Sequence, residues 1–457
     1  MSGNRSGDAM IEDEKSNRLE TVIIILAGFA AEFIVGGCFV DGILVAEWMD
    51  YFHQGSSMTA WLGTVIVGIS FCGALFGNLA VKRFGFRKVF FIASVINATA
   101  ITMTSFAYSF YVAIALRVLA GCGLAVLMNA VGPYLLCRFP NHSAVVQAFR
   151  GMGGSGGTFV FPFIINSCLN EYGWRGCCLI IGGISFQQCA LGLVFRNWSK
   201  DDKHQNQHRN QHPPDEHQES LLGQRKDAKH NLYQLELFKR KMFVAFLVHS
   251  FVLCLSVSTI YVHIVSGSKI LLEISKEQSR FTLSAIAIAL LVGRVVFSIM
   301  TKHPRIDTFT LYMILNALLA IPVGVLPFLK GYTAALVASA SNGIFLSAFG
   351  SLYVLVPLQL FGSECLYMSY SYSTFFSGIG YLLGAPAAGW IYDATGNYAY
   401  SFYFCAGMQI LSVVIMIPGL IKHLTKKSET KTDDDENRVK KLTVESANYI
   451  ISVQSLT

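Results

Sequence analysis

The chain has 457 residues, of which 53% are apolar and only 14% are charged, and its mean hydropathy is +0.48. A soluble globular domain has about a quarter charged residues, so this composition excludes a soluble protein with an ordinary surface. The formal net charge of +7 does not indicate nucleic-acid binding, because Lys and Arg also gather in the cytosolic segments of membrane proteins.

The order of polar and apolar segments predicts two membrane domains. Residues 1–21 are polar and are predicted to form a tail. Six apolar spans follow within 22–195, each close to the ~20 residues that cross a hydrocarbon core as a helix. A polar segment, 196–241, leads to six more spans within 242–421, and 422–457 form a second polar tail. We therefore predict an all-α membrane protein with twelve transmembrane helices in two six-helix bundles.

The distribution of positive charge predicts the orientation in the bilayer. If the first tail is cytosolic, the cytosolic segments hold 27 of the 35 Lys and Arg residues. The segments on the other side hold 5, and the remaining 3 lie within spans. The excess of Lys and Arg in cytosolic loops then predicts that both tails and the segment 196–241 are cytosolic.

Four short stretches carry a resemblance to known transporters. Residues 77–88, between the second and third spans, resemble the loop motif of the major facilitator superfamily, and residues 117–123 resemble its fourth-helix pattern. Residues 173–176 (Gly-Trp-Arg-Gly) and 389–398 resemble segments of the monocarboxylate transporter family within that superfamily. Arg294 is similar in position to an arginine of that family's eighth helix. The chain thus resembles a divergent member of the monocarboxylate transporter family.

The resemblance implies a major facilitator fold that moves a small organic anion across the plasma membrane by alternating access. It also implies a proton as a candidate co-substrate and a single-span accessory glycoprotein as a candidate partner. Two positions depart from the family's lactate carriers. Asp41 stands where they have a lysine, and Leu290 stands where an aspartate precedes the arginine by one turn. A carrier of a zwitterionic or uncharged solute, such as an amino acid or a hormone-like molecule, therefore stays an alternative.

Five charged residues within the spans are the candidate site residues, because a charge near the bilayer centre is costly unless it faces a cavity or a partner. We predict that Arg294 and Asp41 bind substrate. Glu32, Arg117 and Arg150 are predicted to serve proton coupling or to form ion pairs between helices. The alternatives are an ion pair for Arg294, Glu32 as the partner of Arg117, and side chains that extend to water for Asp41 and Arg150.

Two other features within the spans are interpreted as structural. The glycines of residues 151–157 are spaced so that another helix can approach closely. His249 and His263 are candidates for proton relay, but hydrogen bonding within the bundle is the interpretation we favour.

No nucleophile–base constellation, phosphate-binding loop or metal-ligand spacing is present in the sequence, so we expect neither an enzyme nor a bound cofactor or metal. A transporter-like sensor that binds solute without moving it remains a hypothesis of a different class. Net solute flux would distinguish the two.

Overall fold

The computed structural model describes residues 3–139, 143–195, 237–301, 303, 306–362 and 365–425. Most of the predicted linker 196–241 and of the tail 422–457 lies outside these residues. The described part of the chain contains helices and no β-strand. The first half comprises α1 (Gly3–Gly36), η1 (Gly37–Val40), α2 (Gly42–Phe52), α3 (Ser56–Cys72), α4 (Ala74–Phe84), α5 (Phe86–Thr104), α6 (Phe110–Arg138) and α7 (Ser143–Val194). The second comprises α10 (Lys241–Leu271), α11 (Lys276–Met300), α12 (Thr308–Val325), η3 (Leu326–Phe328), α13 (Tyr332–Ser351), α14 (Leu355–Phe361), α15 (Leu366–Thr395) and the helix Tyr398–Thr425.

A helix lies at each of the twelve predicted spans. Within the described residues, nine helices are long and apolar enough to cross a membrane, or ten if the bent pair α3–α4 is one span. Two of the predicted spans share the single long helix α7, which is broken at Gly173 (φ 64, ψ −174). The remaining one is α15, which is 30 residues long but rich in Ser, Tyr and Gly. The predicted all-α class is confirmed.

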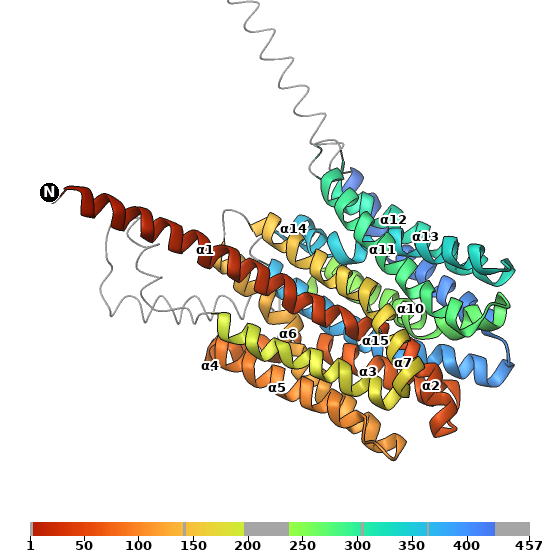
Figure 1. The fold of residues 1–457 in the computed structure, drawn as a ribbon. Coiled ribbons are helices and arrows are strands. Elements are labelled where there is room, and N and C mark those ends of the chain that lie inside the picture. The colour runs from red at the N-terminus through yellow and green to blue at the C-terminus, as the bar shows by residue number, and fades with distance from the viewer. Residues whose placement is uncertain are drawn as a thin grey trace, which may run out of the picture.

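The helices pack as two bundles that meet along a shared interface (Figure 1). In the first half α1 packs along α7, and α6 packs between α3 and α5. In the second half α10 packs along α15, and α13 packs between α11 and α12. The halves meet where α3 lies against α15, α7 against α11 and α2 against α10.

The close approach of α1 and α7 depends on glycine. A Cβ atom at Gly153 or Gly157 of α7 would collide with the carbonyl oxygen of Phe29 or Phe33 on α1. A Cβ at Gly36 would collide with the carbonyl oxygen of Gly154 in return. The prediction that these glycines serve helix packing is therefore confirmed.

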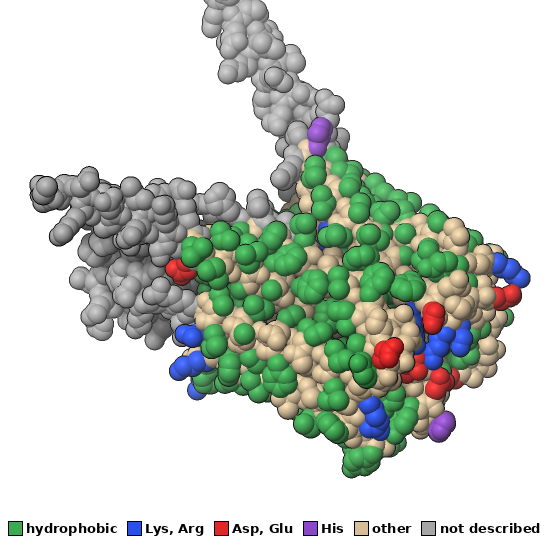
Figure 2. Space-filling model, viewed as in Figure 1, with side chains coloured by type: hydrophobic (Ala, Val, Ile, Leu, Met, Phe, Trp, Pro, Cys, Tyr) green, Lys and Arg blue, Asp and Glu red, His purple; other side chains and the backbone are tan. Residues whose placement is uncertain are grey.

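Charged side chains gather at the two ends of the bundle and leave an apolar band between them (Figure 2). We call one end the basic face; it carries Arg83, Arg87, Lys88, Arg138, Lys239 and Arg240. We call the other end the opposite face; it carries both signs of charge, at Glu47, Arg175, Lys276, Arg280, Lys330 and Asp393.

The two halves are joined at the opposite face by hydrogen bonds to the start of α3. The carboxylate of Asp393, at the end of α15, accepts from the backbone amides of Ser56 and Ser57, each at 2.9 Å. The Ser57 hydroxyl donates to the carbonyl of Pro386 at 2.9 Å. A carboxylate at a helix N-terminus satisfies free amides and the helix dipole together. The motif at residues 389–398 thus closes this face.

Candidate functional site

Arg294 lies on α11 between the two halves of the molecule. Its Nη1 donates to the carbonyl of Gly151 on α7 at 2.6 Å, and its Nε is buried without a partner. The guanidinium passes beside Gly350 of α13, where a Cβ atom would lie 2.5 Å from Nη2. Among the described residues, no ion pair includes Arg294. A planar guanidinium with free donors is a site for a carboxylate.

Arg150 lies beside Arg294, one residue before the glycine that accepts its hydrogen bond. Arg150 Nη1 forms an ion pair with Glu32 of α1. Its Nε donates to Oε1 of Gln147 at 2.8 Å, and Gln147 in turn donates to the carbonyl of Gly132 at 2.8 Å. These contacts pair the Arg150 guanidinium within the bundle, while 23% of the side chain is exposed.

Glu32, Arg150 and Arg294, with Tyr261 and Tyr370, form what we call the two-arginine cluster. The two guanidinium groups lie within electrostatic range of each other, with Tyr370 near Arg150 and Tyr261 near Arg294. Two cations face one carboxylate, so the cluster has a formal charge of +1. Because an uncompensated charge away from bulk water is costly, the cluster favours an additional anion.

Asp41 and Arg117 form a second, separate pair within the first half. Arg117 Nη1 lies 2.5 Å from Asp41 Oδ2, and both side chains are buried, with 4% and 8% exposed. The ring of Trp48 covers the guanidinium, 4.5 Å from its central carbon. Each charge here has its own counter-charge, and the cation–π contact adds to the pairing.

This pairing corrects two alternatives from the sequence. Glu32 is not the partner of Arg117, and Asp41 does not extend to water. The physical reason is the counter-charge: the regular α-helix ends at Gly36, and Asp41, after the 3₁₀ segment Gly37–Val40, is buried against the guanidinium of Arg117. The role of Asp41 in substrate binding stays a prediction.

The two histidines of α10 are hydrogen-bonded within the second half. His249 contacts the carbonyl of Ser412 at 2.8 Å and the hydroxyl of Tyr312 at 2.9 Å. His263 contacts the carbonyl of Ala385 at 2.8 Å. The favoured interpretation is confirmed. Among the described residues, no group of three or more His, Cys, Asp or Glu side chains is arranged to hold a metal ion.

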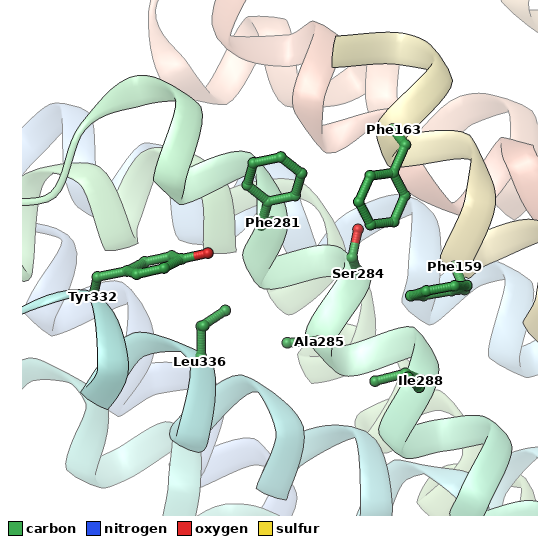
Figure 3. A pocket seen from close by; sticks show the side chains of 8 residues that line it. All are labelled: Phe159, Phe163, Phe281, Ser284, Ala285, Ile288, Tyr332 and Leu336. Atoms are coloured by element: carbon green, nitrogen blue, oxygen red, sulfur yellow. The ribbon is translucent and has the colours of Figure 1, made fainter. Parts of the chain in front are cut away.

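A groove of about 350 Å³ lies between α7, α11 and α13 (Figure 3). Phe163 and Phe281, one from each half, meet across it with ring centroids 5.5 Å apart. Apart from Ser284 and Tyr332 its lining is hydrocarbon, and Phe163 and Ile288 are 44% and 46% exposed on the side of the bundle. A lining without charge suits lipid contact better than a charged solute.

Sequence reasoning missed the aromatic members of the two-arginine cluster and the role of Arg280. Tyr370 shares α15 with four other tyrosines, and Tyr261, the only tyrosine of α10, lies in an apolar run without a motif, so no local signal marks either residue. Arg280 was counted only as a positive charge near a loop. In the structure only 5% of it is exposed, and it is bonded to Glu47, Asn166 and Asn170.

The profile of the Major Facilitator Superfamily matches residues 22–366. Monocarboxylate transporter 14 of Homo sapiens is 26% identical over 87% of this chain and 89% of its own length. Monocarboxylate transporter 9 of Gallus gallus is 24% identical over 87% of this chain and 92% of its own length. The crystal structure of a D-xylose–proton symporter superposes with a TM-score of 0.68 at 14% identity, over 87% of this chain and 97% of that one.

These matches confirm the predicted fold and the expectation of a membrane transporter rather than an enzyme. The chain belongs to the Major Facilitator Superfamily, as a divergent member similar to the monocarboxylate transporters.

Proposed function

We propose that the protein carries a small organic anion across the membrane and that Arg294 binds the anion's carboxylate. The observation that carries this proposal is the Arg294 guanidinium, which has a buried free donor at Nε and no acidic partner among the described residues. A carboxylate would accept two parallel hydrogen bonds from that fork. It would also neutralise the formal charge of the two-arginine cluster.

The position of the cluster between the two halves supports alternating access as the proposed mechanism. Glu32 and Arg150 belong to the first half, whereas Tyr261, Arg294 and Tyr370 belong to the second. A bound anion would therefore contact both halves and respond to their relative movement. Substrate sites in such repeats lie near the midplane, between the halves that rock. Contacts at the opposite face, such as Asp393 with Ser56 and Ser57, would break in each cycle.

A proton is the second proposed substrate, and Glu32 is its proposed carrier. Protonation of Glu32 would remove the negative charge that now neutralises Arg150. Both guanidinium groups would then be available to the anion. A ligand shifts a conformational equilibrium only through differential affinity for its states, and the change at Glu32 supplies such a difference. Asp41 remains the second residue proposed to bind substrate, with a carboxylate that is paired with Arg117 in this structure.

The proposed orientation places the basic face in the cytosol. Both tails and the segment 196–241 would then be cytosolic, and the plasma membrane is the proposed location. Protease added outside intact cells should leave the segment 196–241 uncut, and cleavage there would overturn the orientation. A single-span accessory glycoprotein is a proposed partner through the resemblance to monocarboxylate transporters. Its presence after purification from a native membrane would support that partner.

Uptake by purified protein in liposomes tests the proposed function. The solutes are a panel of radiolabelled monocarboxylates, amino acids and uncharged metabolites, each offered with and without an inward proton gradient. We expect uptake of a monocarboxylate that the gradient increases. Arg294→Lys keeps the charge but loses the planar fork, so it should reduce uptake, whereas Arg83→Lys on the exposed basic face should not.

Two other outcomes would assign a different function. Uptake of an amino acid but of no anion would favour the zwitterion carrier, with Arg294 on the carboxylate and Glu32 on the ammonium group. Their presence in one cluster is the observation that favours this alternative. Saturable binding without flux would make the protein a sensor.

A further inference from the structure

Arg280 is a buried cation at the opposite face whose partners all belong to the other half of the molecule. Its Nη1 donates to the side-chain oxygens of Asn166 (2.5 Å) and Asn170 (3.2 Å) on α7. Its Nη2 donates to Oε1 of Glu47 on α2 at 2.9 Å. The ammonium group of Lys276 lies 2.7 Å from the same Glu47 oxygen. Both cations are therefore on α11, and every acceptor is on the first half.

Separation of the halves at this face would remove all three partners of Arg280 at once. Only 5% of Arg280 is exposed, so while the face is closed these acceptors, rather than water, stabilise its positive charge. Once the face opens, Arg280 and Lys276 would face the gap without Glu47. The N-terminal end of α11, which begins at Lys276, adds the positive end of the helix dipole, which Glu277 in the first turn offsets in part, so two cations and one carboxylate remain on this end of α11. The opened face would then attract anions.

Arg280 and Arg294 also lie along one side of the same helix. They are 14 residues apart, which in an α-helix is a rise of about 21 Å and a rotation only about 40° short of four full turns. Both donate to α7, Arg280 at Asn166 and Asn170 and Arg294 at Gly151. The α7–α11 interface therefore presents one guanidinium at the opposite face and one at the two-arginine cluster.

We propose that Arg280, assisted by Lys276, is an entry site for the anionic substrate at the opposite face. Glu47 forms an ion pair with Arg280 while the face is closed, and the carboxylate of the substrate replaces Glu47 when the halves separate. The proposal rests on the proposed function, because it assumes an anion that then moves on to Arg294. When the substrate carboxylate replaces that of Glu47, the Arg280 guanidinium keeps an anionic partner. Because the substrate binds this site only in the open state, its binding stabilises that state.

The charge of the opened face can be measured without knowing the substrate. Asn170→Cys places a thiol beside Arg280, and the purified variant is held in nanodiscs of phosphatidylcholine, where both faces are accessible. The probes are two thiol reagents of similar size, an anionic sulfonatoethyl and a cationic trimethylammonioethyl methanethiosulfonate. The readout is the ratio of their reaction rates at residue 170, with the native cysteines read separately by mass spectrometry.

We expect Arg280→Gln to lower the ratio of anionic to cationic rate about fivefold or more, the effect of one unit charge a few ångströms away in a solvated site. Arg280→Lys should keep the ratio, which shows that a loss in the glutamine variant is not caused by misfolding. Lys330→Gln removes a cation from the same face. Lys330 is 79% exposed and is paired with Glu273 rather than Glu47, so this variant should change the ratio little. An unchanged ratio in Arg280→Gln would overturn the proposal.

Glu47→Gln tests the exchange itself. It removes the carboxylate that holds Arg280 and Lys276, so both reagents should react faster because the face opens more often. No acceleration, or a thiol that stays unreactive in this variant, would show that Glu47 does not hold the face closed and would reject the exchange. These rates do not depend on transport. If Arg294→Lys left uptake intact, the proposed function would fail while the rate ratio still reported the charge at Arg280.

Discussion

Two pairs in the first half each join a carboxylate to a guanidinium, but the two pairs differ in their surroundings. Asp41 and Arg117 form a closed pair, with one cation, one anion and an aromatic cover, all within one bundle. Glu32 and Arg150 form an open pair, because Arg294 of the second half adds a positive charge that nothing in the cluster neutralises. Both pairs lie inside the bundle, so burial does not distinguish them; the excess positive charge shared between the two halves does.

The largest expected effect comes from opening the closed pair. Arg117→Gln leaves Asp41 buried without its cation, and loss of one partner of a buried pair costs about 3–5 kcal/mol. We expect a large drop in the thermal unfolding midpoint in detergent, followed by tryptophan fluorescence. The double variant Arg117→Gln with Asp41→Asn removes both charges and should recover most of the loss. If the double variant is no more stable than the single, the pairing is not what stabilises this region.

The same substitution at Arg294 should have the opposite profile. Arg294→Gln removes an excess charge, so the unfolding midpoint should stay within a few degrees of wild type. Transport should fall on the order of 100-fold in kcat/KM, because hydrogen bonds between charged groups are worth about 1.5–3 kcal/mol. Uptake of the substrate found in the liposome panel is the measurement. A strongly destabilised Arg294→Gln with normal residual transport would show that Arg294 belongs with the closed pair.

A smaller effect is expected when the open pair is altered at its carboxylate. Glu32→Gln removes the anion that competes for Arg150, so the KM for an anionic substrate should fall, roughly tenfold for one neighbouring charge. If Glu32 carries the proton, uptake by the wild type should rise as pH falls and uptake by this variant should be nearly independent of pH. A variant that keeps the wild-type pH dependence would remove Glu32 from proton coupling.

The sequence was sufficient for the helices and for the candidate charges, because both are local properties. A run of about 20 apolar residues has few alternatives to a membrane helix, and a charged residue inside such a run is visible at once. The partners were not predictable in the same way. The sequence did not show that the regular α-helix ends at Gly36, before Asp41, or that Arg117, 76 residues away, would be the partner of Asp41.

Contacts between distant segments account for the rest. The burial of Arg280 depends on Glu47, which is 233 residues away in sequence, and on Asn166, which is 114 residues away. No spacing or motif in a single sequence reports such proximity. The helix dipole contact of Asp393 was missed for the same reason, although its motif was recognised as a family resemblance.

The smallest expected effect concerns a carboxylate that belongs to neither pair. Asp307 precedes α12 at the basic face; its Oδ2 accepts from the amide and hydroxyl of Thr310, and its Oδ1 from Gln359. His423 Nε2 lies 3.1 Å from Oδ1. Partial burial alone would raise the pKa of Asp307, but these hydrogen bonds outweigh it and hold the pKa below its ordinary value. The ionised carboxylate is therefore the form that the folded protein favours.

Asp307→Ala should cost about 1 kcal/mol, as for loss of a helix N-cap, and thus much less than breaking the Asp41–Arg117 pair. Because the folded-state pKa is lowered, the contribution of Asp307 is complete above the ordinary carboxyl pKa of about 3.9 and is lost progressively as pH falls below it. The difference in unfolding midpoint between wild type and Asp307→Ala should therefore still be present at pH 5 and narrow in more acidic buffer. We attribute the large loss of stability in Arg117→Gln to a buried carboxylate left without its cation. If Asp307→Ala lost as much stability as Arg117→Gln, that explanation would be contradicted.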